Sequence, residues 1–467
     1  MSLIVVIASL VFLIFVAYRG YSVILFAPIA DSLAVLLIDP AAIGPLYSSL
    51  FMEKMAEFVR LYFPVFMLGA IFGKVIELSG LSQSIAATTI RFFGKRNAIL
   101  SVVLVTGVLT YGGVSLFVVV FAVYSFSAQL FRQCNIPKRL IAPTIALGAF
   151  TFPVDALPGT PQIQNIIPTT FFGTDAWAAP RLGLIGSAFI LLIGLLYLNY
   201  RRAHAASAGE GYSTPDWPLL NEPVAAAPQE GHRSAFVALL PLVLVCVGNM
   251  LLTKWIPRVY GLSYSVRLTS GGAAISTAVA KVAAIWAVEA ALVLGILLVF
   301  LIAGRTVIRH FTDGSKSAVS GALLASLNTA TEYGYGAVIA ALPGFSVVAN
   351  SLKLIPDPLL REAVSITTLA GITGSAAGGL SVALGALGHT FVESATSAHI
   401  PMEVLHRVAS MAAGGMDTLP HNGAVITLLA VTGLTHRQSY ADIFAITCMK
   451  VLAVPFVIGV YYLTGIY

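Results

Sequence analysis

Two aspartates open proline-containing phrases in an otherwise apolar chain of 467 residues. Asp155 opens Asp-Ala-Leu-Pro (155–158), and Asp417 opens Asp-Thr-Leu-Pro (417–420). An ionisable side chain at membrane depth costs roughly 2.5–3.5 kcal/mol on insertion scales, so it indicates a functional site by default. A carboxylate or imidazole in such a place can take up a proton and release it elsewhere. The candidates for proton coupling are Asp417, His421, Asp155, Glu332 and Glu393.

Proton binding at these acids can be linked to the binding of an anion. A carboxyl group buried beside a bound anion favours its protonated form, through both desolvation and like charge. Proton and anion then bind with positive coupling, which symport requires. A second interpretation of Asp155 and Asp417 is that each caps the N-terminus of a helix, and the two roles are compatible.

A small anion would be held by backbone N–H groups and hydroxyls, because no arginine lies inside the breaks at 152–161 and 414–423. Helix N-termini favour anions, and glycine lets backbone donors approach a ligand closely. Glycines also serve tight helix packing in membranes, which stays an open alternative. The expected substrate-binding residues are Thr110, Gly112, Gly113, Ser115, Gly159, Thr160, Gln162, Thr373, Ser375, Gly378, Gly379, Ser381 and Asn422.

The elements that must position these residues are membrane helices. The chain is 58% hydrophobic and 10% charged, with a mean hydropathy of +0.91, whereas a soluble domain carries about 25% charged residues. A helix needs about 20 apolar residues to span a bilayer. The sequence therefore predicts an all-α polytopic membrane protein, with apolar runs near residues 2–18, 22–38, 57–79, 97–131, 181–200, 235–253, 279–303, 318–342, 361–392 and 440–466.

Several other classes of protein are disfavoured. The net charge of +6 comes without a basic stripe that carries interleaved aromatics, so no nucleic-acid partner is expected. Cys134, Cys246 and Cys448 are scattered without CxxC spacing, which argues against a metal site or a disulfide framework. HExxH and GxSxG motifs are absent, so neither an enzyme nor a cofactor is expected.

The two aspartate phrases belong to a longer internal repeat. Gly-Gly-Val-Ser (112–115) is echoed by Gly-Gly-Leu-Ser (378–381), and the Ile-Pro pair at 136–137 is echoed at 400–401. Paired, interrupted apolar segments in two halves point to a transporter's binding site. A polar linker separates the halves. The expected units are a leading transmembrane helix (1–21), a first repeat (22–200), a cytoplasmic linker (201–234) and a second repeat (235–467).

The distribution of charge predicts that the second repeat is inverted. Arg305, Arg309 and Lys316 are expected to form a basic loop whose first-half counterpart, 39–53, is not basic. Elsewhere the second half is the poorer in positive charge. By the positive-inside rule, equivalent motifs then face opposite sides of the membrane. The basic residues expected on the cytoplasmic side of the first half are Arg19, Arg91, Lys95, Arg96, Arg132, Lys138, Arg139, Arg201 and Arg202.

Both repeats should contain broken helices. The run 97–131 is too long for one span at about 1.5 Å per residue, and the glycines at 112–113 can end one helix and start another. The run 361–392 repeats this plan. Proline stops helices at 152–161 and 414–423, which predicts two re-entrant hairpins near the bilayer midplane. The alternative is a kinked but continuous helix at each place.

The chain resembles the gluconate/proton symporter family, within the wider ion-transporter superfamily. The resemblance covers nearly the whole chain and is carried by Leu-Gly-Ala-Ile-Phe-Gly-Lys (68–74), Phe-Gly-Lys-Arg (93–96), Asn-Ile-Pro (135–137) and Leu-Pro-Gly-Thr-Pro (157–161). The stretches 109–117 and 145–152 look like the D-β-hydroxybutyrate permease branch. The resemblance implies proton-coupled uptake of a small hydroxycarboxylate across a bacterial inner membrane. It also implies an elevator motion, in which a transport domain slides against a scaffold. By analogy with large elevator carriers, whose scaffold must stay still while the other domain moves, a homodimer is expected.

The chain departs from the gluconate-type pattern at two places. Those members carry a carboxylate near the position of Gly112, and a histidine in the break where this chain has Ala-Leu-Pro-Gly-Thr (156–160). A site with fewer polar groups suits a ligand with fewer hydroxyls, so 3-hydroxybutyrate and gluconate-like acids both stay candidates. A sodium-coupled carboxylate symporter and an anion channel are the alternative functions.

Overall fold

The computed structural model describes residues 2–19, 21–81, 84–85, 97–114, 116–213, 234–267, 274–373, 375–420 and 422–467. Ser115, His421 and the basic residues Arg91, Lys95 and Arg96 lie outside these ranges. In the first half the elements are α1 (Ser2–Tyr18), α2 (Val23–Ile38), η1 (Pro40–Ala42), α3 (Ile43–Leu46), η2 (Tyr47–Phe51), α4 (Met52–Leu78), α6 (Ala98–Tyr111), α7 (Leu116–Gln133), η4 (Lys138–Leu140), α8 (Ile141–Ala149), α9 (Phe152–Asp155), α10 (Ile163–Phe172) and α11 (Pro180–Ser207).

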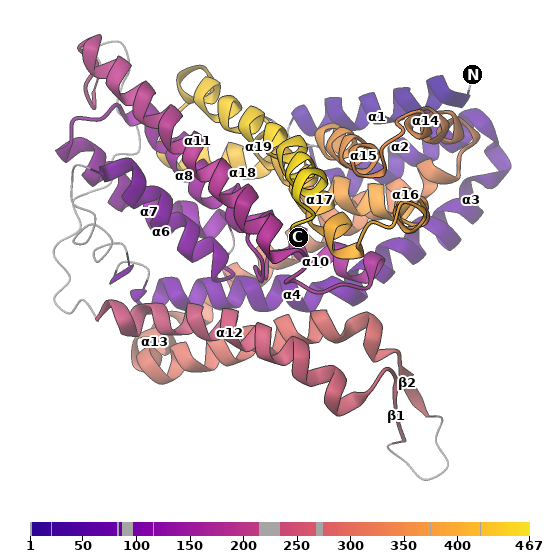
Figure 1. Ribbon diagram of the computed structural model, residues 1–467, viewed down its shortest axis with the longest axis horizontal. Coiled ribbons are helices and arrows are strands. Elements are labelled where there is room, and N and C mark those ends of the chain that lie inside the picture. The colour runs from indigo at the N-terminus through magenta and orange to yellow at the C-terminus, as the bar shows by residue number, and fades with distance from the viewer. Residues whose placement is uncertain are drawn as a thin grey trace.

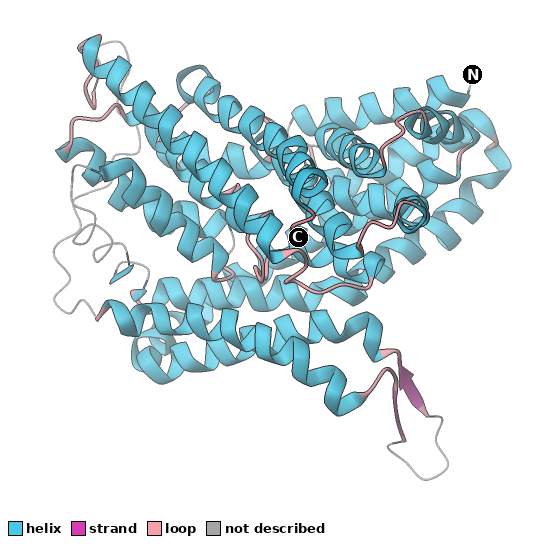
Figure 2. Ribbon diagram, viewed as in Figure 1, coloured by secondary structure: helices cyan, strands magenta, loops and turns pink. Residues whose placement is uncertain are grey.

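The second half is also helical, apart from a two-stranded antiparallel ribbon that protrudes from the molecule (Figure 2). Its elements are α12 (Ala235–Tyr260), β1 (Tyr264–Val266), β2 (Ile275–Thr277), α13 (Val279–Ala341), α14 (Pro343–Lys353), α15 (Pro358–Thr373), α16 (Ala376–Ser397), α17 (Met402–Gly414), η5 (Gly415–Thr418), α18 (Gly423–Thr432) and α19 (His436–Thr464).

The long apolar helices make this a polytopic, helical membrane protein. Hydrophobic side chains cover their outer faces because the bilayer, not water, is the solvent there. Among the described residues, the helical segments long and apolar enough to cross a membrane are Pro40–Leu78, Pro180–Ser207, Phe236–Tyr260, Val282–Ala341 and His436–Thr464. Figure 1 shows α12 beside α13 along one side of α4, with the helices that carry the proline-containing breaks on its other side. α13 also contacts α2 and α16.

All four expected helix breaks are present. α6 ends at Tyr111 and α7 begins at Leu116, with Gly113 between them at φ +95°. α15 ends at Thr373 and α16 begins at Ala376. Irregular chain follows α9 until α10 begins at Ile163, and η5 is followed by irregular chain until α18 begins at Gly423. The kinked but continuous helix is therefore excluded at both proline-containing phrases.

One expected loop is wrong. The basic stretch with Arg305, Arg309 and Lys316 is helical, because α13 runs from Val279 to Ala341 and departs from helical backbone angles at Ala303. This stretch contains no proline, and isolated glycines are tolerated inside a helix at a cost of about 1 kcal/mol. The expected loop is therefore replaced by continuous helix.

Corresponding positions in the two halves share unusual backbone angles. Asn135 and His399, each directly before Ile-Pro, have φ of +49° and +57°. Gly173 and Gly433 end α10 and α18 with φ/ψ of 63°/30° and 63°/31°. The packing is exchanged between halves, since α10 contacts α16 and α17 while α18 contacts α7 and α8. The breaks of one half are therefore enclosed by helices of the other.

Candidate functional site

A buried ion pair joins the proline-containing break at 152–161, called the first break below, to the last helix, α19. Asp155 ends α9, and its Oδ2 accepts a hydrogen bond from Nζ of Lys450 on α19. Their side chains are 0% and 1% exposed. Removing one partner of such a pair leaves an uncompensated charge in a low-dielectric interior, which is strongly unfavourable. The pair therefore ties α9 to α19 at the centre of the molecule.

Asp417, in the proline-containing break at 414–423, accepts hydrogen bonds from residues at the N-terminal ends of three helices, α10, α16 and α18. Its Oδ2 accepts from Gln164 Nε2, in the first turn of α10, at 2.8 Å. Its Oδ1 accepts from the backbone N–H of Ala376, the first residue of α16, at 3.2 Å, and from Asn422 Nδ2 at 3.4 Å. Asp417 therefore occupies the positive N-terminal end of α16.

The N-capping interpretation of the aspartates needs correction. The helix after Asp417 is capped by Asn422, whose Oδ1 accepts from Ala424 N at 2.7 Å. The helix after Asp155 has no side-chain cap at its N-cap residue, Gln162. Asp155 instead pairs with Lys450 on α19, and Asp417 accepts from the Asn422 side chain and from groups of α10 and α16. Asp417 does serve the N-terminus of a helix, but that helix is α16.

A third buried acid, Glu332 on α13, contacts the N-terminal turn of α16. The Ser375 hydroxyl contacts its carboxylate and accepts a hydrogen bond from Gly378 N at 3.1 Å. Gly378 leaves the room that this acid needs, since a Cβ there would lie 1.4 Å from Glu332 Oε2. Within the described structure that oxygen has no hydrogen-bond partner. Lys74, a basic residue of the first half, pairs with Glu77 at 2.9 Å.

Arg407 on α17 holds the irregular backbone of the first break in place. Its Nη1 donates to the Asp155 carbonyl at 2.7 Å and to Asn165 Oδ1 at 3.0 Å, and its Nη2 donates to the Ala178 carbonyl at 2.8 Å. Asn165 Nδ2 in turn donates to the Thr160 carbonyl at 2.9 Å. These bonds satisfy backbone carbonyls that no helix satisfies, which buried backbone requires.

Known proteins share both the sequence and the fold of this chain. No model of a protein family matches it. The chain is 54% identical, over 475 residues and the whole of both proteins, to "Uncharacterized transporter YxjC" of Bacillus subtilis (strain 168). It belongs to the family of that transporter. The YdaH transporter of Alcanivorax borkumensis, whose crystal structure is described as having an unusual topology, shares the fold, with a TM-score of 0.50 and 15% identity over 92% of this chain and 90% of that one.

Within this transporter, several predicted site residues come together. Asp417, Glu332, Ser375 and Gly378 meet around the start of α16, and Asp155 lies against Gly414, three residues before Asp417. Asn422 joins them through its bond to Asp417. Because they come from both breaks and from α13, only the folded chain assembles them. They form the candidate site of the transporter.

Other predicted residues serve packing or lie elsewhere. Glu393 is exposed on α16 and pairs with His389 at 3.3 Å, apart from the buried acids. Ser381 Oγ donates within its own helix, to the Ala377 carbonyl at 2.8 Å. The remaining glycines of the prediction pack against neighbours, because added Cβ atoms would meet Leu242, Pro161, Trp177 and Ala370 at Gly112, Gly113, Gly159 and Gly379 respectively.

Some polar side chains around the first break are hydrogen-bonded, and others have no partner among the described residues. Gln162 Nε2 donates to the Thr110 carbonyl at 2.7 Å and bridges to the Val114 carbonyl at 3.2 Å. The hydroxyls of Thr110 and Thr160 are buried and have no partner among the described residues. Unpartnered buried hydroxyls are uncommon and call for an explanation, and a bound ligand is one. Thr373 ends α15 beside the second-half break.

Two of the buried cations, Lys450 and Arg407, and the amide Gln164 were not predicted from the sequence. Lys450 lies within the apolar run 440–466, where an ionisable residue is a signal of function. That rule was applied to the acids of the breaks and not to this helix. Arg407 lies outside the break at 414–423, so the absence of arginine from the breaks did not mean that no cation reaches them.

Substituting Gly414 with alanine should destabilise the site. An added Cβ would lie 1.5 Å from Asp155 Oδ2 and 2.5 Å from Lys450 Nζ, so the ion pair would have to move. Overpacking of this kind costs about 1–3 kcal/mol, which thermal unfolding in detergent can measure. Gly423→Ala is the matched control, because nothing lies within 4 Å of its added Cβ. Equal melting temperatures for the two variants would contradict this account.

Proposed function

We propose that the protein is a secondary active transporter that couples the uptake of a small hydroxycarboxylate to protons across a bacterial inner membrane. The observation that carries the proposal is Asp417, a buried carboxylate held on the N-terminal end of α16. That end is where a substrate carboxylate would bind, since a helix N-terminus favours anions. The Asp417 carboxylate therefore occupies the position that suits the carboxylate of the substrate.

The charges around Asp417 support coupling to a proton. Lys450 is paired with Asp155, and the donors of Arg407 are directed to carbonyl groups. Lys450 also acts electrostatically on Asp417 although its ion pair is with Asp155, and no cation is paired with Glu332 within the described cluster. An incoming anion would be repelled by two ionised acids, and a proton on one of them relieves the repulsion. Substrate and proton thus favour each other's binding, as symport requires.

Release of the α16 N-terminus by Asp417 would create the anion site. A protonated Asp417 is a weaker acceptor than a carboxylate, because charge-assisted hydrogen bonds are roughly twice as strong as neutral ones. The Ala376 N–H then becomes available to the substrate. Ser375, Gly378 and Gly379, which were predicted from the sequence to bind substrate, belong to the same region.

We further propose that the two halves are inverted repeats, with re-entrant hairpins at the two proline-containing breaks. The matched φ angles and the exchanged packing support this. The last helices of the two halves, α11 and α19, pack antiparallel, which supports it too. The ring centroids of Phe189 and Phe456 are 4.2 Å apart, while Arg201 Nε lies 2.6 Å from Asp442 Oδ1. The bounds stay 22–200 and 235–467, with 1–21 as a leading helix and 201–234 as a linker.

An elevator motion fits this arrangement. The layer of α4, α12 and α13 in Figure 1 would be the scaffold, and the helices carrying the breaks would be the transport domain. We propose that two copies associate so that the scaffold stays still while the other domain moves.

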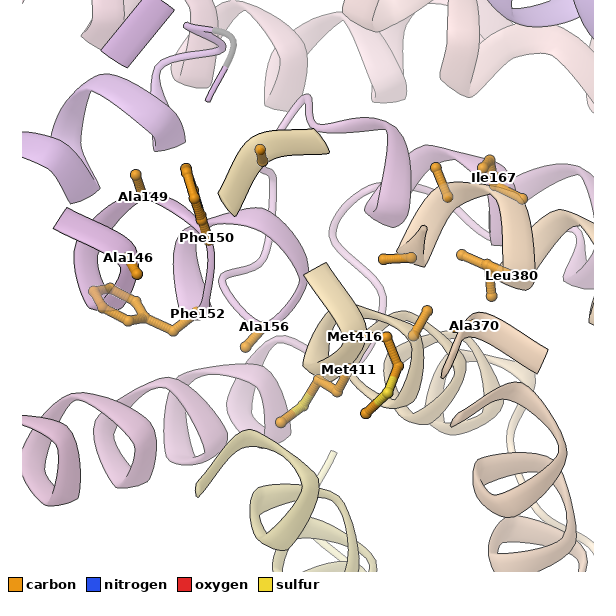
Figure 3. Packing of buried hydrophobic residues seen from close by; sticks show 14 of the residues in the cluster. Ala146, Ala149, Phe150, Phe152, Ala156, Ile167, Ala370, Leu380, Met411 and Met416 are labelled. Atoms are coloured by element: carbon orange, nitrogen blue, oxygen red, sulfur yellow. The ribbon is translucent and has the colours of Figure 1, made fainter. Parts of the chain in front are cut away.

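The character of the neighbouring core favours a small, partly apolar acid. Figure 3 shows Ala156, Ala370, Met411 and Met416 among the buried side chains near the two breaks. A methyl-bearing acid such as 3-hydroxybutyrate suits such surroundings better than a polyhydroxylated one, whose hydroxyls would need partners. The resemblance to D-β-hydroxybutyrate permeases supports the same substrate class. Gluconate-like acids are the other hydroxycarboxylates that we propose as substrates.

Uptake by proteoliposomes tests the function. We expect saturable accumulation of labelled 3-hydroxybutyrate in sodium-free buffer when the outside is made acidic, and its collapse when a protonophore is added. Accumulation that needs a sodium gradient would establish the sodium-coupled alternative. Non-saturable, ohmic current would establish an anion channel. Accumulation of gluconate alone would refute the proposed preference for the smaller acid.

A further inference from the structure

Gln164 carries a buried hydrogen-bond acceptor beside the carboxylate of Asp417. It is the second residue of α10 and is 4% exposed. Its Nε2 donates to Asp417 Oδ2 at 2.8 Å, whereas its Oε1 has no hydrogen-bond partner among the described residues. A buried acceptor without a partner is costly, so a ligand group that donates to Oε1 is favoured at this position.

The contacts of Gln164 determine which atom of its amide is left over. An ionised carboxylate accepts hydrogen bonds and donates none, so the amide turns its NH₂ group to Asp417. The backbone of Gln164 is held separately, because Ser410 Oγ on α17 donates to its carbonyl at 3.1 Å and to the Asp155 carbonyl at 3.0 Å. The atom left over is therefore an acceptor, on a residue that is held at both its amide and its backbone.

Glu332 Oε2 is another buried oxygen near the start of α16 without a partner in the described structure, and it lies against Gly378. The two oxygens are not equivalent. A carboxyl group that takes up a proton gains a donor, whereas the carbonyl oxygen of an amide only accepts. Gln164 Oε1 therefore stays an acceptor whether or not the neighbouring acids carry a proton.

Gln164 and the N-terminal end of α16 are joined through one carboxylate. Gln164 Nε2 lies 2.8 Å from Asp417 Oδ2, and the backbone N of Ala376 lies 3.2 Å from Asp417 Oδ1. Because Oε1 and Nε2 of Gln164 are bonded to the same carbon, the acceptor Oε1 and the donor N–H of Ala376 lie within reach of one small molecule. A 3-hydroxy acid has the complementary groups, a carboxylate that accepts and a hydroxyl that donates.

We propose that Gln164 Oε1 accepts a hydrogen bond from the hydroxyl group of the substrate, while the N-terminal end of α16 holds the substrate carboxylate. This inference rests on the function proposed above and makes Gln164 a specificity-determining residue. An acid of the same length without the hydroxyl leaves Oε1 unpaired, and an acid with a ketone there brings two acceptors together. A site that binds a substrate hydroxyl rejects such analogues.

The binding of three four-carbon acids to the unsubstituted protein tests the proposal. At the hydroxyl position, 3-hydroxybutyrate donates, 3-oxobutyrate only accepts and butyrate does neither. The concentration of each acid that stabilises the purified protein against thermal unfolding in detergent gives its apparent Kd. We expect 3-hydroxybutyrate to bind about tenfold or more tighter than either analogue. Equal affinities for 3-hydroxybutyrate and 3-oxobutyrate would overturn the proposal, because an acceptor does not favour a ketone.

Variants of Gln164 show whether the preference depends on this residue. Gln164→Met keeps a similar length and loses the amide, so the preference for 3-hydroxybutyrate over butyrate should fall to about twofold or less. Gln164→Glu, when protonated, can donate to Asp417 and keeps an oxygen acceptor, so the preference should persist at acidic pH. Gln133→Met is the matched control, because Gln133 is exposed at the end of α7, and it should keep the full preference.

The outcomes separate this inference from the proposed function. Equal weakening of both acids in a folded Gln164→Met protein would mean that Gln164 only supports the fold, and would overturn the inference. If Gln164→Met does not fold, loss of the preference in protonated Gln164→Glu overturns it instead. If proteoliposomes take up no 3-hydroxybutyrate although its binding preference depends on Gln164, the proposed transport fails and the hydroxyl contact stands.

Discussion

We expect Lys450→Met to abolish uptake and to destabilise the protein, because Lys450 pairs with Asp155. Both side chains are buried, so methionine would leave the Asp155 carboxylate without a cation. Breaking a buried pair by removing one partner costs about 3–5 kcal/mol. Thermal unfolding in detergent measures the loss of stability, and uptake of labelled 3-hydroxybutyrate measures the loss of transport.

A double variant separates charge balance from function. Asp155→Asn combined with Lys450→Met removes both charges, so it should recover much of the stability while transport stays abolished. Lys254→Met is the matched control, because Lys254 is exposed on α12, and it should leave stability nearly unchanged. If Lys450→Met transported normally, the ion pair would be no part of the transport cycle.

Asp417→Asn should abolish pH-driven accumulation and spare exchange of substrate. Asparagine keeps an acceptor for the Ala376 N–H but cannot carry a proton. Its amide would face the donor Nε2 of Gln164, and this clash is relieved when the Gln164 amide turns, since its Oε1 has no partner in the described structure. The fold should therefore survive. Accumulation under an acid gradient and counterflow at equal pH are the two measurements.

The two assays together identify the role of Asp417. Loss of both activities in a folded protein would mean that Asp417 binds the ligand and is not a proton carrier. Accumulation at the normal level would show that another acid carries the proton. Asp313→Asn is the matched control, because it makes the same chemical change on an exposed side chain.

The helix breaks were predictable because their causes are local. Proline lacks an N–H and clashes with the preceding turn wherever it occurs, so the irregular segments around Pro158 and Pro420 follow from the sequence alone. Gly113, at φ +95°, allows the turn between α6 and α7 for a reason equally local. The acids Asp155, Asp417 and Glu332 were identified by the same kind of reasoning, since a charge is costly at membrane depth whatever surrounds it.

The side of each membrane helix that faces protein was not predictable. In a soluble protein, the polar face of a helix marks the solvent. In a bilayer the lipid-facing side and the packed side are both apolar, so the pattern does not separate them. Glu393 and Glu332 therefore looked alike in the sequence, although one is exposed beside His389 and the other is buried against Gly378.

The sequence by itself determined that the chain is a helical membrane protein, where glycine and proline interrupt its helices, and which acids are costly enough to need a purpose. Only the tertiary structure decided their partners. Lys450 meets Asp155 across 295 positions, and Gln164 meets Asp417 across 253. Contacts at such separations depend on how whole helices pack, because no local preference of the chain specifies which charge will neutralise which.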